Sequence, residues 1–176
     1  MPHWSDSAVG ANEARKKKDQ RWVLSSRSDM REAAALICRT AERKVSIMTR
    51  DLEPGIYDHP DFLEAVKKLI LSRRFARVRV LISDPSRAIK NGNRLVTMGR
   101  RLNSFIEFRN VHDDYREVPE AYCIADDRAI AYRLDATRWD GIADSDTRPV
   151  ARTYLNSFDE IWAASEVENE FRRLHL

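Results

Sequence analysis

The sequence predicts a single α/β domain in which helices flank a mixed β-sheet on both faces. Short β-branched and apolar runs, such as VSIMT (45–49) and VRVLI (78–82), alternate with helix-type segments of about 12 residues, an order typical of crossover units. The chain has 176 residues, 43% of them hydrophobic, which suits one domain of ordinary size with a substantial core.

The first half of the chain shows strand and helix signals in alternation. RWVLSS (21–26) indicates a short strand, and Ser28 is the expected N-cap of the helix that follows. After the VSIMT strand comes a loop with the turn signal Pro54-Gly55. Asp61 is expected to open the second helix, which leads into the VRVLI strand.

The second half begins with a third helix, expected over residues 86–103 after Asp84-Pro85-Ser86. SFIEF (104–108) alternates as a strand does. AYCIAD and RAIAYRL are expected to form a tight hairpin around Asp126 and Asp127. TRWDGIADSDTRP reads as a loop, VARTYLNSFDEIWAAS as the last long helix, and ENEFRRLHL as a short closing strand.

The terminal residues and the two cysteines indicate the expected cellular location. We expect residues 1–20, with the basic run Arg15 to Lys18, to be a flexible polar tail, and residues 21–176 to be the domain. No run approaches the ~18 apolar residues of a membrane span, and the tail lacks the apolar core of a secretory signal. Cys38 and Cys123 are isolated and are expected to be small buried hydrophobes. The expected location is the cytoplasm, without membrane insertion.

Charge is distributed unevenly along the chain. Residues 67–101 carry eleven Lys and Arg against one acid, whereas residues 110–170 carry fifteen acids against six arginines. Folding can interleave these segments or leave a basic face and an acidic face. Separate faces favour nucleic acid, other anionic partners or head-to-tail self-association.

Several motifs together suggest a family. EAYCIADD (120–127) has the spacing of H-x-K-x-x-x-x-D, of which only Asp127 matches. KVSIMTR follows the first helix, ARVRVLISD follows the second, and the last long helix ends in FDEIW. On these features the chain resembles a single phospholipase D-like domain over roughly residues 21–170, and it is similar to small bacterial proteins of that type.

The resemblance implies a mechanism that this chain departs from. In the family two such motifs meet, one histidine attacks phosphorus, the other protonates the leaving oxygen, and the lysines hold the phosphoryl oxygens. Here Glu120 stands for the histidine and Tyr122 for the lysine. A carboxylate repels phosphate, and a phenol carries no positive charge at pH 7. We therefore expect no catalytic residue and no phosphohistidine chemistry.

Two other interpretations of the acidic residues stay open. Glu120, Tyr122 and Asp127 could be a rebuilt phosphodiesterase or hydrolase site. A set of acids and one histidine could also gather as an oxygen-rich metal site, but acids in loops are usually solvated, so we expect no metal and no cofactor. That set is Glu120, Asp126, Asp127, His112, Asp113 and Asp114.

The remaining candidates are cations on the expected third helix. Arg87, Lys90, Arg94 and Arg101 recur at helical spacing and would share one face that attracts a polyanion such as nucleic acid. Phe75 is the one aromatic residue interleaved with the basic segment, so stacking on single strands is not indicated. The sequence thus favours a catalytically inactive domain acting by binding. Its partner would be a protein or a second copy as a homodimer, with nucleic acid as the other candidate.

Overall fold

The computed structural model describes residues 20–173. The predicted tail, including the basic run Arg15 to Lys18, lies outside the described residues except for Gln20. The division into a tail and a domain therefore stays a prediction. Within residues 20–173, no helix is both long enough and apolar enough to cross a membrane.

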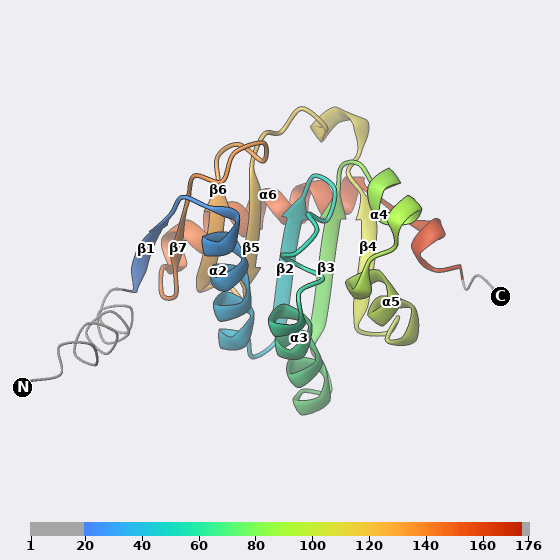
Figure 1. The fold of residues 1–176 in the computed structure, drawn as a ribbon, viewed down its shortest axis with the longest axis horizontal. Coiled ribbons are helices and arrows are strands. Elements are labelled where there is room, and N and C mark those ends of the chain that lie inside the picture. The colour runs from blue at the N-terminus through green and yellow to red at the C-terminus, as the bar shows by residue number, and fades with distance from the viewer. Residues whose placement is uncertain (1–19, 174–176) are drawn as a thin grey trace, which may run out of the picture.

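One mixed sheet of eight strands forms the centre of the domain, in the order β1-β7-β6-β5-β2-β3-β4-β8 (Figure 1). β2, β3 and β4 run parallel to one another, and every other neighbouring pair is antiparallel. The strands are β1 (Arg21–Leu24), β2 (Lys44–Thr49), β3 (Arg77–Ile82), β4 (Ile106–Asn110), β5 (Ala121–Ala125), β6 (Ala129–Arg133), β7 (Gly141–Asp144) and β8 (Glu166–Val167).

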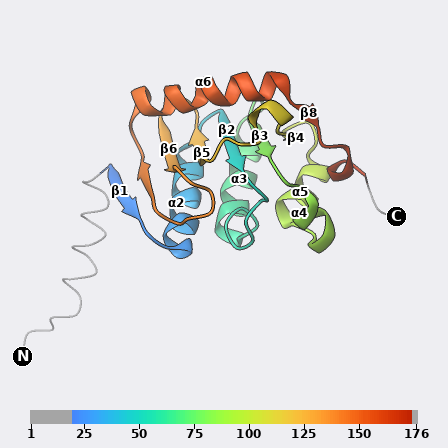
Figure 2. The same cartoon turned by 90° about the horizontal axis from the view of Figure 1, so that it is seen from above.

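Helices cover both faces of the sheet, as predicted. Four lie on one face: α2 (Arg27–Thr40), α3 (Pro60–Ser72), α4 (Ser86–Asn91) and α5 (Arg94–Arg101). The long helix α6 (Arg148–Ala164) crosses the other face alone (Figure 2). An apolar cluster lies between the sheet and the helices on each face, and the larger of the two lies under α2, α3 and α5. The two buried faces explain why the central strands have continuous apolar runs.

Local sequence sets the starts of the first two helices. The Ser26 side chain accepts a hydrogen bond from the Asp29 N–H and so caps α2, two residues before the predicted cap Ser28. His59 caps α3 through Nδ1, and Pro60 occupies its first turn, where its missing N–H costs nothing. Cys38 and Cys123 are both buried and free, as predicted.

Three predicted elements are wrong. The helix expected over residues 86–103 is two short helices, because Gly92 takes φ 74° and Asn93 then caps α5 by accepting from the N–H groups of Leu95 and Val96. The expected loop TRWDGIADSDTRP contains strand β7, and Gly141 at its start fits because a Cβ there would meet the Tyr132 carbonyl oxygen at 2.5 Å. The closing strand expected over ENEFRRLHL does not form in its described part, residues 168–173: β8 ends just before it, and Asn169–Phe171 form a 3-10 turn.

The shared direction of β2, β3 and β4 gives the sheet two distinct edges. The loops that enter these strands, residues 41–43, 73–76 and 102–105, lie at the amino edge, at the bottom of Figure 1. The loops that leave them lie at the carboxyl edge, at the top. Since β5 is antiparallel to β2, Glu120 at its start joins the carboxyl edge, and the turn after it joins the amino edge.

A buried ion pair holds the loop that leaves β2. The Arg133 guanidinium is 0% exposed and lies 2.6 Å from Glu53 Oε1, and Glu53 Oε2 accepts from the Thr49 hydroxyl. Arg133 also donates to the carbonyl oxygens of Ala136 and Arg138. One side chain therefore joins the loop that leaves β2 to the loop that leaves β6.

Replacing Arg133 by alanine is expected to lower the free energy of unfolding by about 3–5 kcal/mol, because Glu53 would keep a buried charge without its partner. Urea denaturation followed by circular dichroism measures this loss. The matched control is Arg138→Ala, which breaks an exposed pair with Asp140 and should cost at most about 1 kcal/mol. Equal losses in the two variants would show that the buried ion pair contributes no more to stability than an exposed one.

Candidate functional site

The motif-equivalent residues do not form one site. Glu120 lies just before β5 at the carboxyl edge, Tyr122 lies within β5, and Asp127 follows β5 at the amino edge. A strand rises about 3.3 Å per residue, so Glu120 and Asp127 lie at opposite ends of the sheet. The geometry separates the three side chains that the rebuilt-hydrolase interpretation would need together.

Tyr122 is part of the core under α6. Its side chain is 2% exposed, and its ring contacts Tyr154 edge-on at 5.0 Å between centroids. Burial raises the pKa of Tyr122 well above its usual range, and the nearby Glu120 carboxylate raises it further. The phenol is therefore neutral and cannot replace a lysine that holds phosphoryl oxygens.

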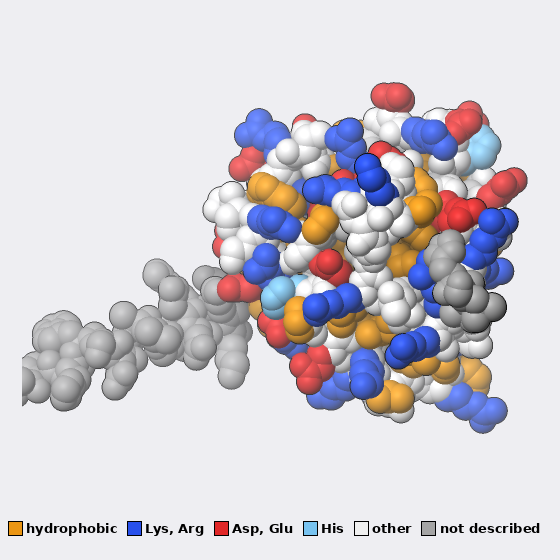
Figure 3. Space-filling model, turned by 45° about the vertical axis from the view of Figure 1, so that its right-hand side comes forward, with side chains coloured by type: hydrophobic (Ala, Val, Ile, Leu, Met, Phe, Trp, Pro, Cys, Tyr) orange, Lys and Arg blue, Asp and Glu red, His pale blue; other side chains and the backbone are white. Residues whose placement is uncertain are grey.

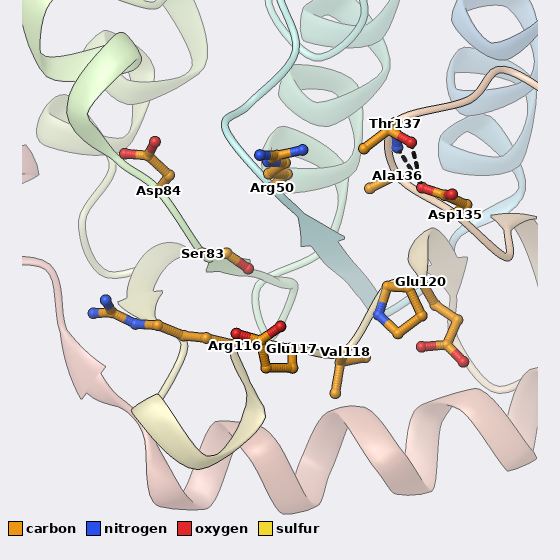
Figure 4. Close-up of a pocket in the computed structure, with 11 residues that line it drawn as sticks. Arg50, Ser83, Asp84, Arg116, Glu117, Val118, Glu120, Asp135, Ala136 and Thr137 are labelled. Atoms are coloured by element: carbon orange, nitrogen blue, oxygen red, sulfur yellow. Dashed lines mark hydrogen bonds between the residues drawn. The ribbon is translucent and has the colours of Figure 1, made fainter.

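Glu120 lines a pocket of about 390 Å³ at the carboxyl edge. Figure 4 shows Glu120 on the side of the pocket next to α6, with Arg50 and Thr137 across from it. Neither Arg50 nor Glu120 forms an ion pair with a described residue. The lining residues are Arg50, Ser83, Asp84, Arg116, Glu117, Val118, Pro119, Glu120, Asp135, Ala136 and Thr137.

The chemistry available in this pocket differs from that of the family motif. Its lining residues include no histidine, lysine or cysteine, so none supplies a neutral imidazole or a thiolate as nucleophile. Two of its acids are already engaged: Asp84 accepts from Ser86, and Asp135 accepts from the Thr137 N–H and hydroxyl. These hydrogen bonds lower the pKa of both carboxyls, which stay ionised. The pocket is polar and of mixed charge.

Asp126 and Asp127 are structural residues in the β5–β6 turn. Asp126 takes φ 53°, and its carboxylate accepts from the backbone N–H groups of residues 42–44. Asp127 accepts from Arg152 Nε at 3.0 Å, with Arg148 at 3.7 Å. Asp126 thus joins the hairpin to the loop before β2, and Asp127 joins it to α6.

The described residues hold no cluster of three or more His, Cys, Asp and Glu side chains placed to bind a metal ion. His112 instead caps a 3-10 turn (Asp113–Tyr115) by accepting from the Asp114 N–H. The acids proposed as a metal site lie at both edges of the sheet, since Asp126 and Asp127 are far from Glu120.

The four cations expected on one helix are distributed over two. Arg87 lies on α4 and pairs with Asp51 at 3.0 Å, next to the carboxyl edge. Lys90 and Arg94 flank the break at Gly92, and Arg101 ends α5 beside the amino edge. The prediction that the four residues share one face of a single helix is therefore wrong. A binding role for them stays a prediction.

A larger group of cations, which the sequence does not reveal as one surface, gathers at the amino edge. All members are exposed, and none forms an ion pair with a described residue. Figure 3 shows Lys and Arg side chains with hydrophobic ones between them along the lower part of the molecule. We name this group the basic edge: Arg39, Arg43, Lys44, Arg73, Arg74, Arg77 and Arg101.

Two acids near the basic edge, Glu42 and Asp126, form no ion pair with its cations. The oxygens of Asp126 are occupied by backbone N–H groups. Arg79, which belongs to the same basic segment of the sequence, is internal: it pairs with Asp159 on α6 and lies over the Phe158 ring. The fold thus uses Arg79 internally and leaves four other cations of that segment, Arg73, Arg74, Arg77 and Arg101, at the amino edge.

Comparison with known families and sequences gives one match. A family model described as "Domain of unknown function (DUF7931)" matches residues 26–174. A search of curated proteins finds no match.

Solved structures resemble this chain in fold. TrmBL2, an archaeal chromatin protein whose structure "shows a novel mode of DNA binding", has a TM-score of 0.63 and 12% identity over 94% of this chain and 67% of its own. Nuc from Salmonella typhimurium, a phospholipase D family member, has a TM-score of 0.56 and 13% identity, with 84% and 98% covered. Phosphatidylserine synthase from Haemophilus influenzae has a TM-score of 0.57 and 13% identity, with 89% and 41% covered.

These likenesses confirm the predicted phospholipase D-like α/β fold. At identities of 12–13% these likenesses show the fold and no activity, because one fold hosts many unrelated activities.

The Asp127 contact to α6 gives a pH-dependent prediction. The hydrogen bond from Arg152 lowers the pKa of Asp127, and Arg148 adds to this. Its stabilisation is therefore complete above about pH 4, the usual range of an aspartate, and is lost as the pH falls through the lowered pKa. Asp127→Asn should cost about 0.5–1 kcal/mol at neutral pH, a value reduced by solvent screening. Thermal unfolding across a pH series tests this, and a cost that persists in strong acid contradicts it.

Proposed function

We propose that this chain, which belongs to the family described as Domain of unknown function (DUF7931), is a phospholipase D-like domain that binds nucleic acid without cleaving it. The binding surface in this proposal is the basic edge. The location proposed for the protein is the cytoplasm.

The unpaired cations of the basic edge are the observation that carries the proposal. Surface Lys and Arg that lack carboxylate partners can replace the counterions of a phosphate backbone, and this release drives binding. The cations lie in or directly beside the three loops that follow α2, α3 and α5, along one edge of the sheet. A row of this kind suits an extended polyanion better than a small ligand.

The structural neighbours support the choice of nucleic acid. The printed description of TrmBL2 concerns DNA binding by a chromatin protein, and this chain covers 67% of that protein's length. The likeness concerns fold, so it supports a phospholipase D-like domain as a binding module and transfers no residue.

The side chains at positions 120 and 122 support the proposed absence of cleavage. Tyr122 is a buried neutral phenol, and Glu120 faces the pocket with a carboxylate, which repels a phosphodiester. The alternative, a rebuilt phosphodiesterase using Glu120, Tyr122 and Asp127, requires residues from opposite edges of the sheet. Pairing with a second copy or another protein stays a prediction from the family resemblance.

Binding of a labelled oligonucleotide should be strong at low salt and weaken steeply as salt is added. If about four phosphates are contacted, affinity should fall roughly a hundredfold between about 50 and 200 mM salt. Arg43→Glu with Arg73→Glu should weaken binding by about tenfold or more at constant salt, because two contacts become repulsive. Fluorescence anisotropy measures both effects.

The matched control carries the same charge change at the carboxyl edge, Arg116→Glu with Arg138→Glu. This variant should bind nearly as tightly as the unmodified protein. Equal weakening by the two double variants would show that net charge alone acts, and no binding at low salt would refute the proposal.

Cleavage should be undetectable when the protein is incubated with a generic phosphodiester, with and without divalent ions. The physical reason is the absence of an imidazole or ammonium in the pocket at Glu120. Turnover that disappears in Glu120→Gln would establish the enzyme alternative. Turnover that persists in this variant would point to a contaminating nuclease.

A further inference from the structure

Two aromatic side chains lie among the cations of the basic edge. Phe75, in the loop between α3 and β3, is 78% exposed, and the Arg74 guanidinium lies 5.7 Å from its ring centroid. The Ala76 N–H donates to the Arg73 carbonyl oxygen, which closes a tight turn around Phe75. A single exposed ring is common on protein surfaces, but this one lies beside guanidinium groups on the proposed binding surface.

Phe105 provides the second ring. It precedes β4 and is partly exposed, with one side packed on the core. The Arg77 guanidinium lies 5.7 Å from its centroid, and Arg77 Nη1 also donates to the Ala76 carbonyl oxygen. The Val78 N–H donates to the Phe105 carbonyl oxygen at 2.7 Å. The two loops are therefore adjacent, although about 30 residues separate the rings in the sequence.

We infer that the basic edge binds single-stranded nucleic acid in preference to duplex, with unpaired bases stacking on Phe75 and Phe105. This inference rests on the proposed function and adds the form of nucleic acid. The phosphates would contact the cations, and the bases would contact the rings and the guanidinium planes of Arg74 and Arg77.

The physical argument is the accessibility of base faces. In a duplex the bases are stacked on one another, so a protein ring gains contact only where a base is freed. In a single strand each base has an open face, and stacking on an aromatic side chain is favourable for every base type. Guanidinium groups beside the rings extend the same planar surface. Phosphate contacts alone would favour the higher charge density of duplex.

An anionic membrane surface is the competing partner, because Leu71 is 75% exposed near Phe75. A membrane would use Leu71 and Phe75 alike as apolar side chains. Base stacking needs the ring and has no use for Leu71. The Arg–aromatic pairs favour nucleic acid, and the difference between these two side chains separates the partners.

The experiment measures anisotropy with a labelled single-stranded oligonucleotide and with its duplex, for the full chain and three variants. Phe75→Ala should weaken single-strand binding about tenfold and leave duplex binding unchanged. Phe75→Trp should retain or strengthen single-strand binding. Leu71→Ala, the matched control, should behave as the unmodified protein. Thermal unfolding of each variant verifies the fold, and exposure of Phe75 and Leu71 makes loss of folding unexpected.

Four results would overturn the inference. Equal or tighter binding of duplex, or no effect of Phe75→Ala, would refute stacking while leaving the proposed function in place. Absence of binding to either nucleic acid at low salt would refute both. Binding instead to vesicles containing phosphatidylglycerol, weakened equally by Phe75→Ala and Leu71→Ala, would assign the edge to a membrane surface.

Discussion

The parallel pairing of β2, β3 and β4 is the constraint on which the surface of this domain depends. Parallel strands are joined by crossover connections. The loops that enter β2, β3 and β4 therefore lie at one edge of the sheet, and the loops that leave these strands lie at the other. The cations of the basic edge lie in or beside the entering loops, and the leaving loops carry Asp84 and the pocket at Glu120. Strand direction thus separates the basic edge from the pocket of mixed charge at the opposite edge.

Helix α6 determines what the face opposite α2 and α3 can do. It buries Tyr122 with Tyr154 and Phe158, and it is held by Arg79 and Arg109, whose guanidiniums lie over the Phe158 and Trp162 rings. Strand β5 keeps the spacing of a phosphoryl-transfer motif, but its central side chain packs in the core. The pocket that remains at the strand end has mixed charge and no nucleophile of the family type. Conversely, no helix of residues 20–173 crosses the amino edge, and the cations of the basic edge form no ion pair with a described residue.

Much of the fold could be predicted from the sequence, because strands such as VRVLI and the β5–β6 hairpin have strong local signals. The helix expected over residues 86–103 failed because a single glycine at 92 takes a positive φ, which periodicity does not register. Strand β7 was missed because GIAD is short and bordered by turn residues. The basic edge and the nearness of Phe75 to Phe105 depend on strand order, which no local pattern contains. Asp126 likewise acts on residues more than 80 positions away.

The central claim is that the amino edge, not the pocket at Glu120, contacts nucleic acid. Chemical-shift mapping by NMR tests it most directly, since a chain of 20.5 kDa gives resolved backbone amide signals. On addition of a single-stranded oligonucleotide, the account predicts that shifts concentrate in residues 39–44, 72–77 and 101–105. Shifts that concentrate instead in residues 116–120 and 134–137, around the pocket, would contradict it.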